Sequence, residues 1–308
     1  MKKRFLYAGL ICVFLWVHLF AAGPNKDIIP KANGNIIFAY KNFERYLNSD
    51  KSWQTYESMV LNSYLAMSAL HQHNLKYGFI DSVQFQGEMQ SCTLDDYVSY
   101  LNNVSDEKLV RLYDSVIERM DGMLAPLDSV DVVFYLPYGR DCFIMGVDGR
   151  MTIYISIKYP VEQMERILIH EYAHNLHHQR WPAEPSVLKR WVVSEGLASY
   201  LPLLLSDSAT IYDGLWMMPK ENVDWCMTHE GLVLDSLAVD LETGGLDISK
   251  KYIAGGEGFA TPPVGMPEKT GYYIGYRMVE NCFRQGMSLQ DFCNATTREI
   301  MEKSGMFE

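Results

Sequence analysis

The segment His170-Glu171-Tyr172-Ala173-His174 combines residue types and a spacing that suit metal chemistry. Residues four apart lie on one face of an α-helix, so the imidazoles of His170 and His174 can bind one metal ion together. Glu171 directly follows the first histidine, which leaves its carboxylate beside the ion as a base rather than as a ligand. The pattern therefore predicts a zinc site at which Glu171 takes a proton from water.

A zinc site of this kind needs a third ligand from elsewhere in the chain. A third histidine in an H-x-x-G-x-x-H continuation is excluded, because His177 occupies the glycine position and Arg180 the position of the last histidine. Residues 194–198 (S-E-G-L-A) offer Glu195 instead, 21 residues after His174. The sequence favours Glu195 as the third ligand, with a metal held elsewhere as the alternative.

Two helices must hold these residues. The apolar residues around the motif, including Leu176, predict a helix from 161 to about 180, and a second is expected from about 188 to 205. The short connection between them contains two prolines and lets the second helix turn back towards the first. Gly196 and Ala198 are small, which allows close helix packing beside the site.

Three short strands are expected before the first of these helices. Residues 131–136 form one strand, and residues 143–147 and 151–157 form a hairpin on the turn Asp148-Gly149.

The rest of the chain is predicted to be mainly helical. Residues 35 to about 124 carry two apolar stripes with helical spacing, the second of them behind an N-cap at Ser105. The first stripe consists of Tyr56, Met59, Val60, Tyr64 and Met67. Residues 206–271 have the least regular pattern, and the chain is helical again from Tyr272 almost to its end. This order predicts an α+β fold.

Three segments give the chain a resemblance to a known group of enzymes. These segments are residues 169–174 (I-H-E-Y-A-H), residues 194–198 and the tyrosine-rich residues 271–276 (G-Y-Y-I-G-Y). Together they resemble the gluzincin group of zinc metallopeptidases and, within it, the DUF2268 family of predicted Zn-dependent proteases. The likeness covers roughly residues 131–280. It implies a zincin-like catalytic domain, with a small sheet and an active-site helix followed by a helical C-terminal part. Because zincin-like folds place an edge strand above the active helix, it also implies that strand 151–157 is an edge to which an extended peptide can add. The alternative is a sheet that only packs on the helix.

The resemblance also implies roles for single residues. One Zn²⁺ per chain is expected, with a water at the fourth position and Glu171 as general base. The implied zinc ligands are His170, His174 and Glu195. Gluzincins commonly stabilise the oxyanion with a tyrosine or histidine, and Tyr276 or Tyr272, four apart on one helical face, is the candidate here. Core packing is the alternative role for these tyrosines.

The N-terminus predicts export. Basic residues 2–4 precede an uncharged, mostly apolar run over residues 5–22, and small residues 21–23 offer a cleavage site. Residues 1–23 are therefore expected to be a signal peptide or, alternatively, an uncleaved N-terminal anchor. The chain has 38 Asp and Glu against 27 Lys and Arg, which argues against a nucleic-acid partner.

The predicted organisation is thus a signal peptide or anchor at 1–23, a helical N-terminal region at 24–127 and a zincin-like metallopeptidase domain at 128–308. The expected function is hydrolysis of a peptide or protein substrate in the periplasm, outside the cell or at the outer face of a membrane, with membrane contact only through an uncleaved anchor. The alternative is a catalytically inactive zincin-fold binding module at the cell surface or in the periplasm. The presence of the base and all three ligands argues against this alternative.

Overall fold

The computed structural model describes residues 26–77, 83, 87, 94–123, 129–136, 142–180, 184–206, 208–256 and 258–307. The expected signal peptide or anchor at 1–23 lies outside these residues, and so does the expected domain boundary at 127/128. Over the part of the chain that is described, no helix is long and apolar enough to span a membrane.

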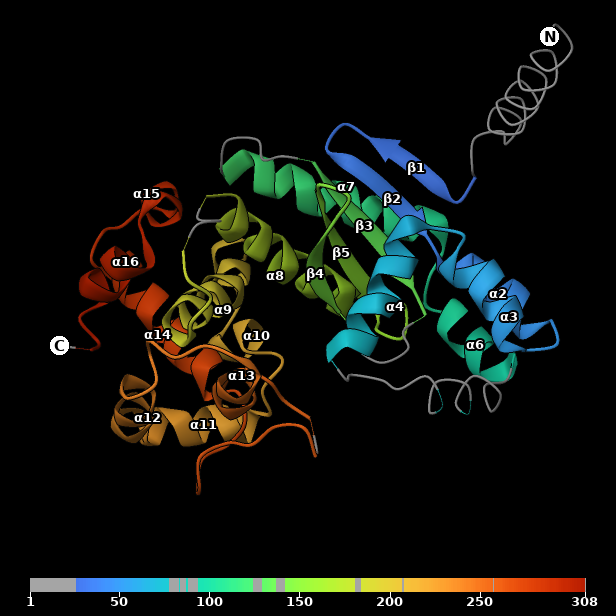
Figure 1. Ribbon diagram of the computed structural model, residues 1–308. Helices are drawn as coiled ribbons and strands as arrows, with labels where there is room; N and C mark the ends of the chain where they lie inside the picture. Colours follow the sequence, from blue (N-terminus) through green and yellow to red (C-terminus); the bar gives the residue numbers. More distant parts are fainter. Residues whose placement is uncertain are drawn as a thin grey trace, which may run out of the picture.

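A five-stranded mixed sheet lies among many helices, in the strand order β1-β2-β3-β5-β4 (Figure 1). Strands β2 (Gly34–Phe38), β3 (Val130–Tyr135) and β5 (Arg150–Ser156) run parallel to one another. The two outer strands, β1 (Ile28–Lys31) and β4 (Phe143–Val147), are antiparallel to their neighbours. The fold class is therefore α+β, as predicted.

The three predicted strands are confirmed, but the predicted edge is wrong. The hairpin between β4 and β5 turns at Asp148 and Gly149, which both have positive φ angles, 48° and 78°, as an Asp-Gly turn requires. Strand β5 lies between β3 and β4, and residues 152–157 are buried without interruption, which is typical of a central strand. The edge next to β5 is β4.

The expectation that residues from 35 onwards are helical is wrong at its start. Residues 34–38 form β2, and the side chains of Ile36, Ile37 and Phe38 are buried in the sheet. A short apolar run has no periodicity that separates a strand from a helix. One of the two partners of β2, strand β3, also lies far along the chain. The sheet thus joins strands from both sides of the predicted boundary at 127/128, and the division into two domains stays a prediction.

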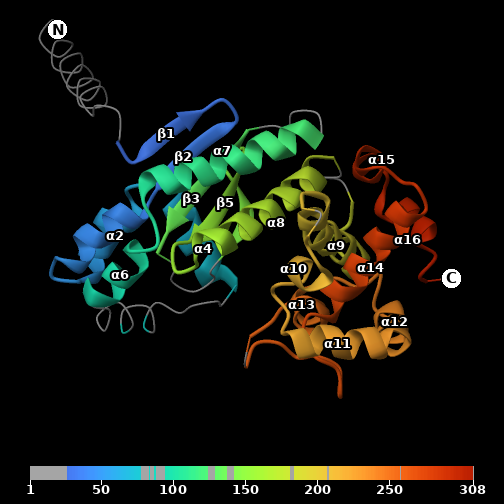
Figure 2. The same cartoon turned by 180° about the vertical axis from the view of Figure 1, so that it is seen from behind.

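Helices cover both faces of the sheet (Figures 1 and 2). α7 (Asp106–Met123) and α8 (Val161–Arg180) lie across one face, and α4 (Leu65–Tyr77) lies on the other. On the α4 face the hydroxyl of Tyr154 donates a hydrogen bond of 2.7 Å to the carbonyl of Ala66. The predicted N-cap of α7 is confirmed, because the N–H of Lys108 donates to Oγ of Ser105 over 3.3 Å.

The first N-terminal stripe is interrupted. It extends over α3 (Trp53–Tyr56), a π-helical turn (Glu57–Leu61) and the start of α4, while α2 (Tyr40–Leu47) and α6 (Leu94–Leu101) are further helices of this region. Four members of the stripe are buried, but Met59 is 39% exposed. The wider π turn changes the angular step between residues and rotates Met59 out of the buried face.

The helix pair predicted around the motif is confirmed, because α8 is followed by α9 (Leu188–Leu204). Residues 206–271, expected to be irregular, contain four short helices with too few turns for a clear period. These are α10 (Ile211–Gly214), α11 (Lys220–Thr228), α12 (Glu230–Ala238) and α13 (Leu246–Tyr252). The predicted C-terminal helices are α14 (Thr270–Arg284), α15 (Leu289–Asn294) and α16 (Thr297–Ser304).

Candidate metal centre

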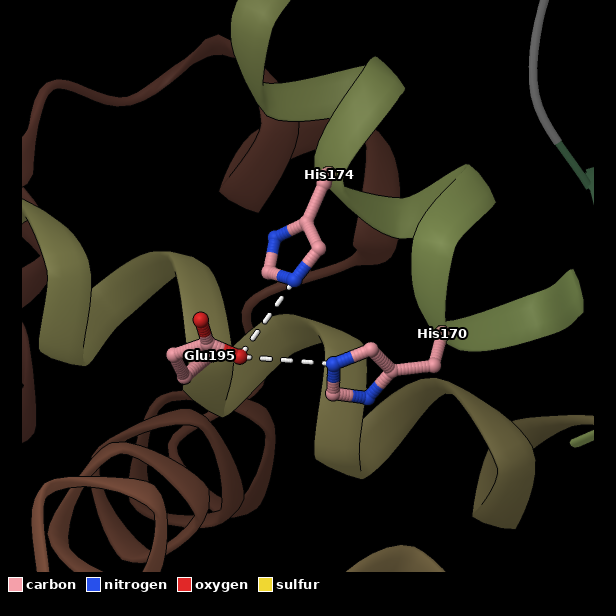
Figure 3. Close-up of side chains that lie close together, drawn as sticks. All are labelled: His170, His174 and Glu195. Atoms are coloured by element: carbon pink, nitrogen blue, oxygen red, sulfur yellow. Dashed lines mark ion pairs between the residues drawn. The ribbon is translucent and has the colours of Figure 1, made fainter. Parts of the chain in front are cut away.

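Helices α8 and α9 bring His170, His174 and Glu195 together (Figure 3). Oε2 of Glu195 lies 3.3 Å from Nε2 of His170 and 3.3 Å from Nε2 of His174. One candidate ligand atom from each residue lies within 4.8 Å of the other two. Among the described residues this is the one group of three or more His, Cys, Asp or Glu side chains close enough to share a metal ion.

The chemistry of these three groups fits zinc. Burial raises the pKa of the Glu195 carboxyl, but the imidazoles of His174 and His170 in their protonated form outweigh this effect and hold its pKa below the ordinary range. Oε2 of the resulting carboxylate is buried and has no hydrogen bond of good geometry from the described residues. When the imidazoles are neutral, three electron-pair donors converge at this point, and two histidines with one carboxylate are a common zinc ligand set.

Glycine residues set the distance between α9 and α14 behind the site. A Cβ on Gly196 would overlap the backbone carbonyl of Gly275, and a Cβ on Gly275 would overlap the carbonyl oxygen of Val192. The two helices therefore cross with their backbones in contact. The small residues near Glu195 predicted close packing of this kind beside the site. This crossing carries the tyrosine-rich segment of α14 to the metal centre.

The two candidate tyrosines of α14 lie in different surroundings. The Tyr272 ring is nearly parallel to the imidazole of His170, at 12° and with ring centroids 6.2 Å apart. The Tyr276 ring packs against Tyr200 at 5.3 Å, and burial, with the charge of Glu280, raises the pKa of its hydroxyl. Of the two, Tyr272 is the one that the structure places against a candidate ligand.

Glu171 directly follows His170 on α8 and is buried. It is 7% exposed, and a helical step of about 100° separates it from His170. The next residue on this turn, Tyr172, is buried in the core. Glu171 is thus close to the metal centre without being one of the three grouped residues.

The structure adds two neighbours of the metal centre to which the sequence analysis assigns no role. The ring of Trp216 meets His170 edge-on, at 81° with centroids 6.5 Å apart. Trp216 follows α10, in the stretch without a regular pattern, so no sequence signal points to it. Ser194 is part of the segment that suggested Glu195, and its hydroxyl lies 2.9 Å from Nδ1 of His174.

The chain is similar to a known protein family. Residues 139–302 match the family described as "Predicted Zn-dependent protease (DUF2268)". The matched range includes all six candidate site residues and begins after β3. No curated protein and no solved structure is significantly similar to the chain.

Proposed function

The chain belongs to the DUF2268 family of predicted Zn-dependent proteases, and we propose that it is an exported, gluzincin-like zinc peptidase with a zincin-like catalytic domain. The observation that carries this proposal is the convergence of His170, His174 and Glu195 from two helices. In the proposal these three residues hold one zinc ion. Residues 1–23, with their basic start and apolar run, support the export.

The residues around the ion have separate tasks in this proposal. A zinc ion supplies a Lewis acid that polarises a peptide carbonyl and lowers the pKa of water. Glu171 accepts the proton of the attacking water and later delivers it to the leaving amine. The hydroxyl of Tyr272 donates a hydrogen bond to the oxyanion that develops on the carbonyl oxygen.

The position of β4 at one end of the sheet supports a peptide as the substrate. Within the described residues β4 pairs with β5 alone, so its second edge is where a further strand could add. An extended peptide can add to such an edge through backbone hydrogen bonds, largely independently of its sequence. Since β4 also packs against α8, a peptide bound there would lie near the helix that carries Glu171.

Replacing Glu171 by glutamine tests the proposed function. The amide keeps the size of the side chain but cannot accept the proton, so we expect Glu171→Gln to bind zinc normally. Its rate of hydrolysis on a peptide library should fall by about 10²- to 10⁴-fold. Glu162→Gln, an exposed position of the same helix, is the matched control and should keep the wild-type rate.

An unchanged rate in Glu171→Gln would contradict the role of Glu171 as general base. A wild-type protein that binds zinc but cleaves no member of the library would instead support the binding module that keeps the fold without catalysis.

A further inference from the structure

Ser194 contacts the nitrogen of His174 that faces away from the proposed metal. Its Oγ lies 2.9 Å from Nδ1 of His174, while Nε2 of the same ring faces Glu195 at 3.3 Å. Building on the proposed function, we propose that Ser194 is a positioning residue for zinc binding. Its hydroxyl accepts the Nδ1–H of His174 and so leaves the lone pair of Nε2 directed at the ion.

The chemistry of imidazole explains why this contact matters. A neutral imidazole carries one proton, and the partner of one ring nitrogen decides which nitrogen holds it. Histidines that bind metals usually donate their second N–H to a nearby acceptor, which fixes both the tautomer and the ring orientation. A serine hydroxyl can accept this hydrogen bond and donate its own proton elsewhere.

The two histidines are held in different ways. The side chain of His170 is 2% exposed and packs between Tyr272 and Trp216, and its Nδ1 has no hydrogen bond from the described residues. Packing alone can thus orient this ring. The side chain of His174 is more exposed, at 12%, so the orientation of its ring depends more strongly on the hydrogen bond to Ser194.

Ser194 and Glu195 are neighbours on α9, so one helix supplies both the third ligand and the support of the second ligand. Any movement of α9 along its axis shifts the carboxylate and the hydroxyl together. The segment 194–198 therefore acts as a unit in this proposal, with Ser194 as a functional member of it.

Zinc affinity of the purified protein, measured by competition with a chromophoric chelator, tests the proposal. Ser194→Ala should bind zinc about 10- to 100-fold more weakly than the wild type. Ser194→Thr, which keeps the hydroxyl, should restore most of the affinity. Ser199→Ala is the matched control on the same helix, because the Ser199 hydroxyl is buried without a hydrogen-bond partner among the described residues, and it should bind zinc normally.

A second measurement reports on the hydrogen bond itself. In the zinc-loaded protein, the Nδ1–H of His174 should exchange slowly with solvent by NMR, and Ser194→Ala should accelerate this exchange. Equal zinc affinity in Ser194→Ala and wild type would overturn the proposal and leave the proposed function intact. An equal loss of zinc affinity in Ser199→Ala would also overturn the proposal, because it would show that any substitution of this kind in α9 weakens zinc binding. A wild-type protein without zinc would overturn the proposed function and this inference with it.

Discussion

Glu195 is largely withdrawn from water and faces two imidazole rings. A buried carboxylate is stable only with compensating partners, and neutral imidazoles that present lone pairs give it none. A bound divalent cation would neutralise the carboxylate and use all three lone pairs. Metal binding should therefore also stabilise the folded protein, because the unfolded chain has no such preformed site.

At the residue scale, the two tyrosines of α14 can be separated by mutation. If the Tyr272 hydroxyl stabilises the oxyanion, Tyr272→Phe should lower kcat by about 10²- to 10³-fold with little change in KM. Tyr276→Phe should leave kcat near the wild-type value, because that ring packs on Tyr200. Steady-state kinetics on one cleaved peptide measures both. The reverse ranking of the two variants would assign the oxyanion contact to Tyr276.

The sequence predicts residues whose relation is local and misses those that tertiary structure brings in. His170 and His174 are found because a four-residue spacing on a helix is enough to place them together. Trp216 meets His170 only through the path of the chain after α10. Ser194 is visible in sequence, but its contact with His174 depends on how α8 and α9 are rotated against each other, which no local pattern encodes.

At the element scale, the crossing of α9 and α14 places Tyr272 and Glu195 on the same side of α8. Side chains at Gly196 and Gly275 would push the two helices apart. We expect Gly275→Ala to lower the free energy of unfolding by about 1–3 kcal/mol, because the core must shift to accept the methyl group. Zinc affinity should fall as well, since Glu195 moves with α9.

Gly231→Ala is the control for this change. A Cβ at Gly231 in α12 meets no other atom within 4 Å, so alanine should be neutral or stabilise by up to about 1 kcal/mol. Denaturant unfolding of both variants, together with the zinc titration, makes the comparison. A Gly275→Ala protein as stable as Gly231→Ala would show that the close crossing does not hold the site.

Element prediction succeeded where the pattern is complete within one segment. The hairpin of β4 and β5 has its turn and both strands in consecutive residues, and α8 has five turns of apolar spacing. The hairpin of β1 and β2 is an exception: it is equally local, but its short apolar runs have no period that separates a strand from a helix. The second partner of β2, strand β3, is distant in sequence: the N–H and side-chain amide of Asn35 donate to Asp131, 96 residues away. The short helices between 206 and 271 were missed because tertiary packing, more than their own periodicity, stabilises them.

At the scale of the whole molecule, buried tyrosines make the fold sensitive to alkali. Burial raises the pKa of several phenols, in the case of Tyr172 to about 12, above the ordinary value near 10. The others are Tyr113, Tyr154, Tyr200, Tyr252, Tyr273 and Tyr276. Above pH 10 the unfolded chain releases protons that the folded chain retains, so the free energy of unfolding falls as pH rises.

We therefore expect the contribution of these phenols to be fully present below pH 10 and lost as pH rises through about 12. Absorbance at 295 nm and circular dichroism, followed together against pH, check this. Exposed tyrosines should ionise first, and a second group should ionise only as the structure unfolds. Complete ionisation near pH 10 with the dichroism unchanged would contradict it.

The measurement that tests the central claim most directly is the metal content of the purified protein by elemental analysis, beside that of the His174→Ala variant. We predict about one zinc per wild-type chain and none in the variant, because the loss of one of three ligands breaks the site. A folded wild-type protein that holds no zinc after incubation with the metal would contradict the assignment of His170, His174 and Glu195 as zinc ligands.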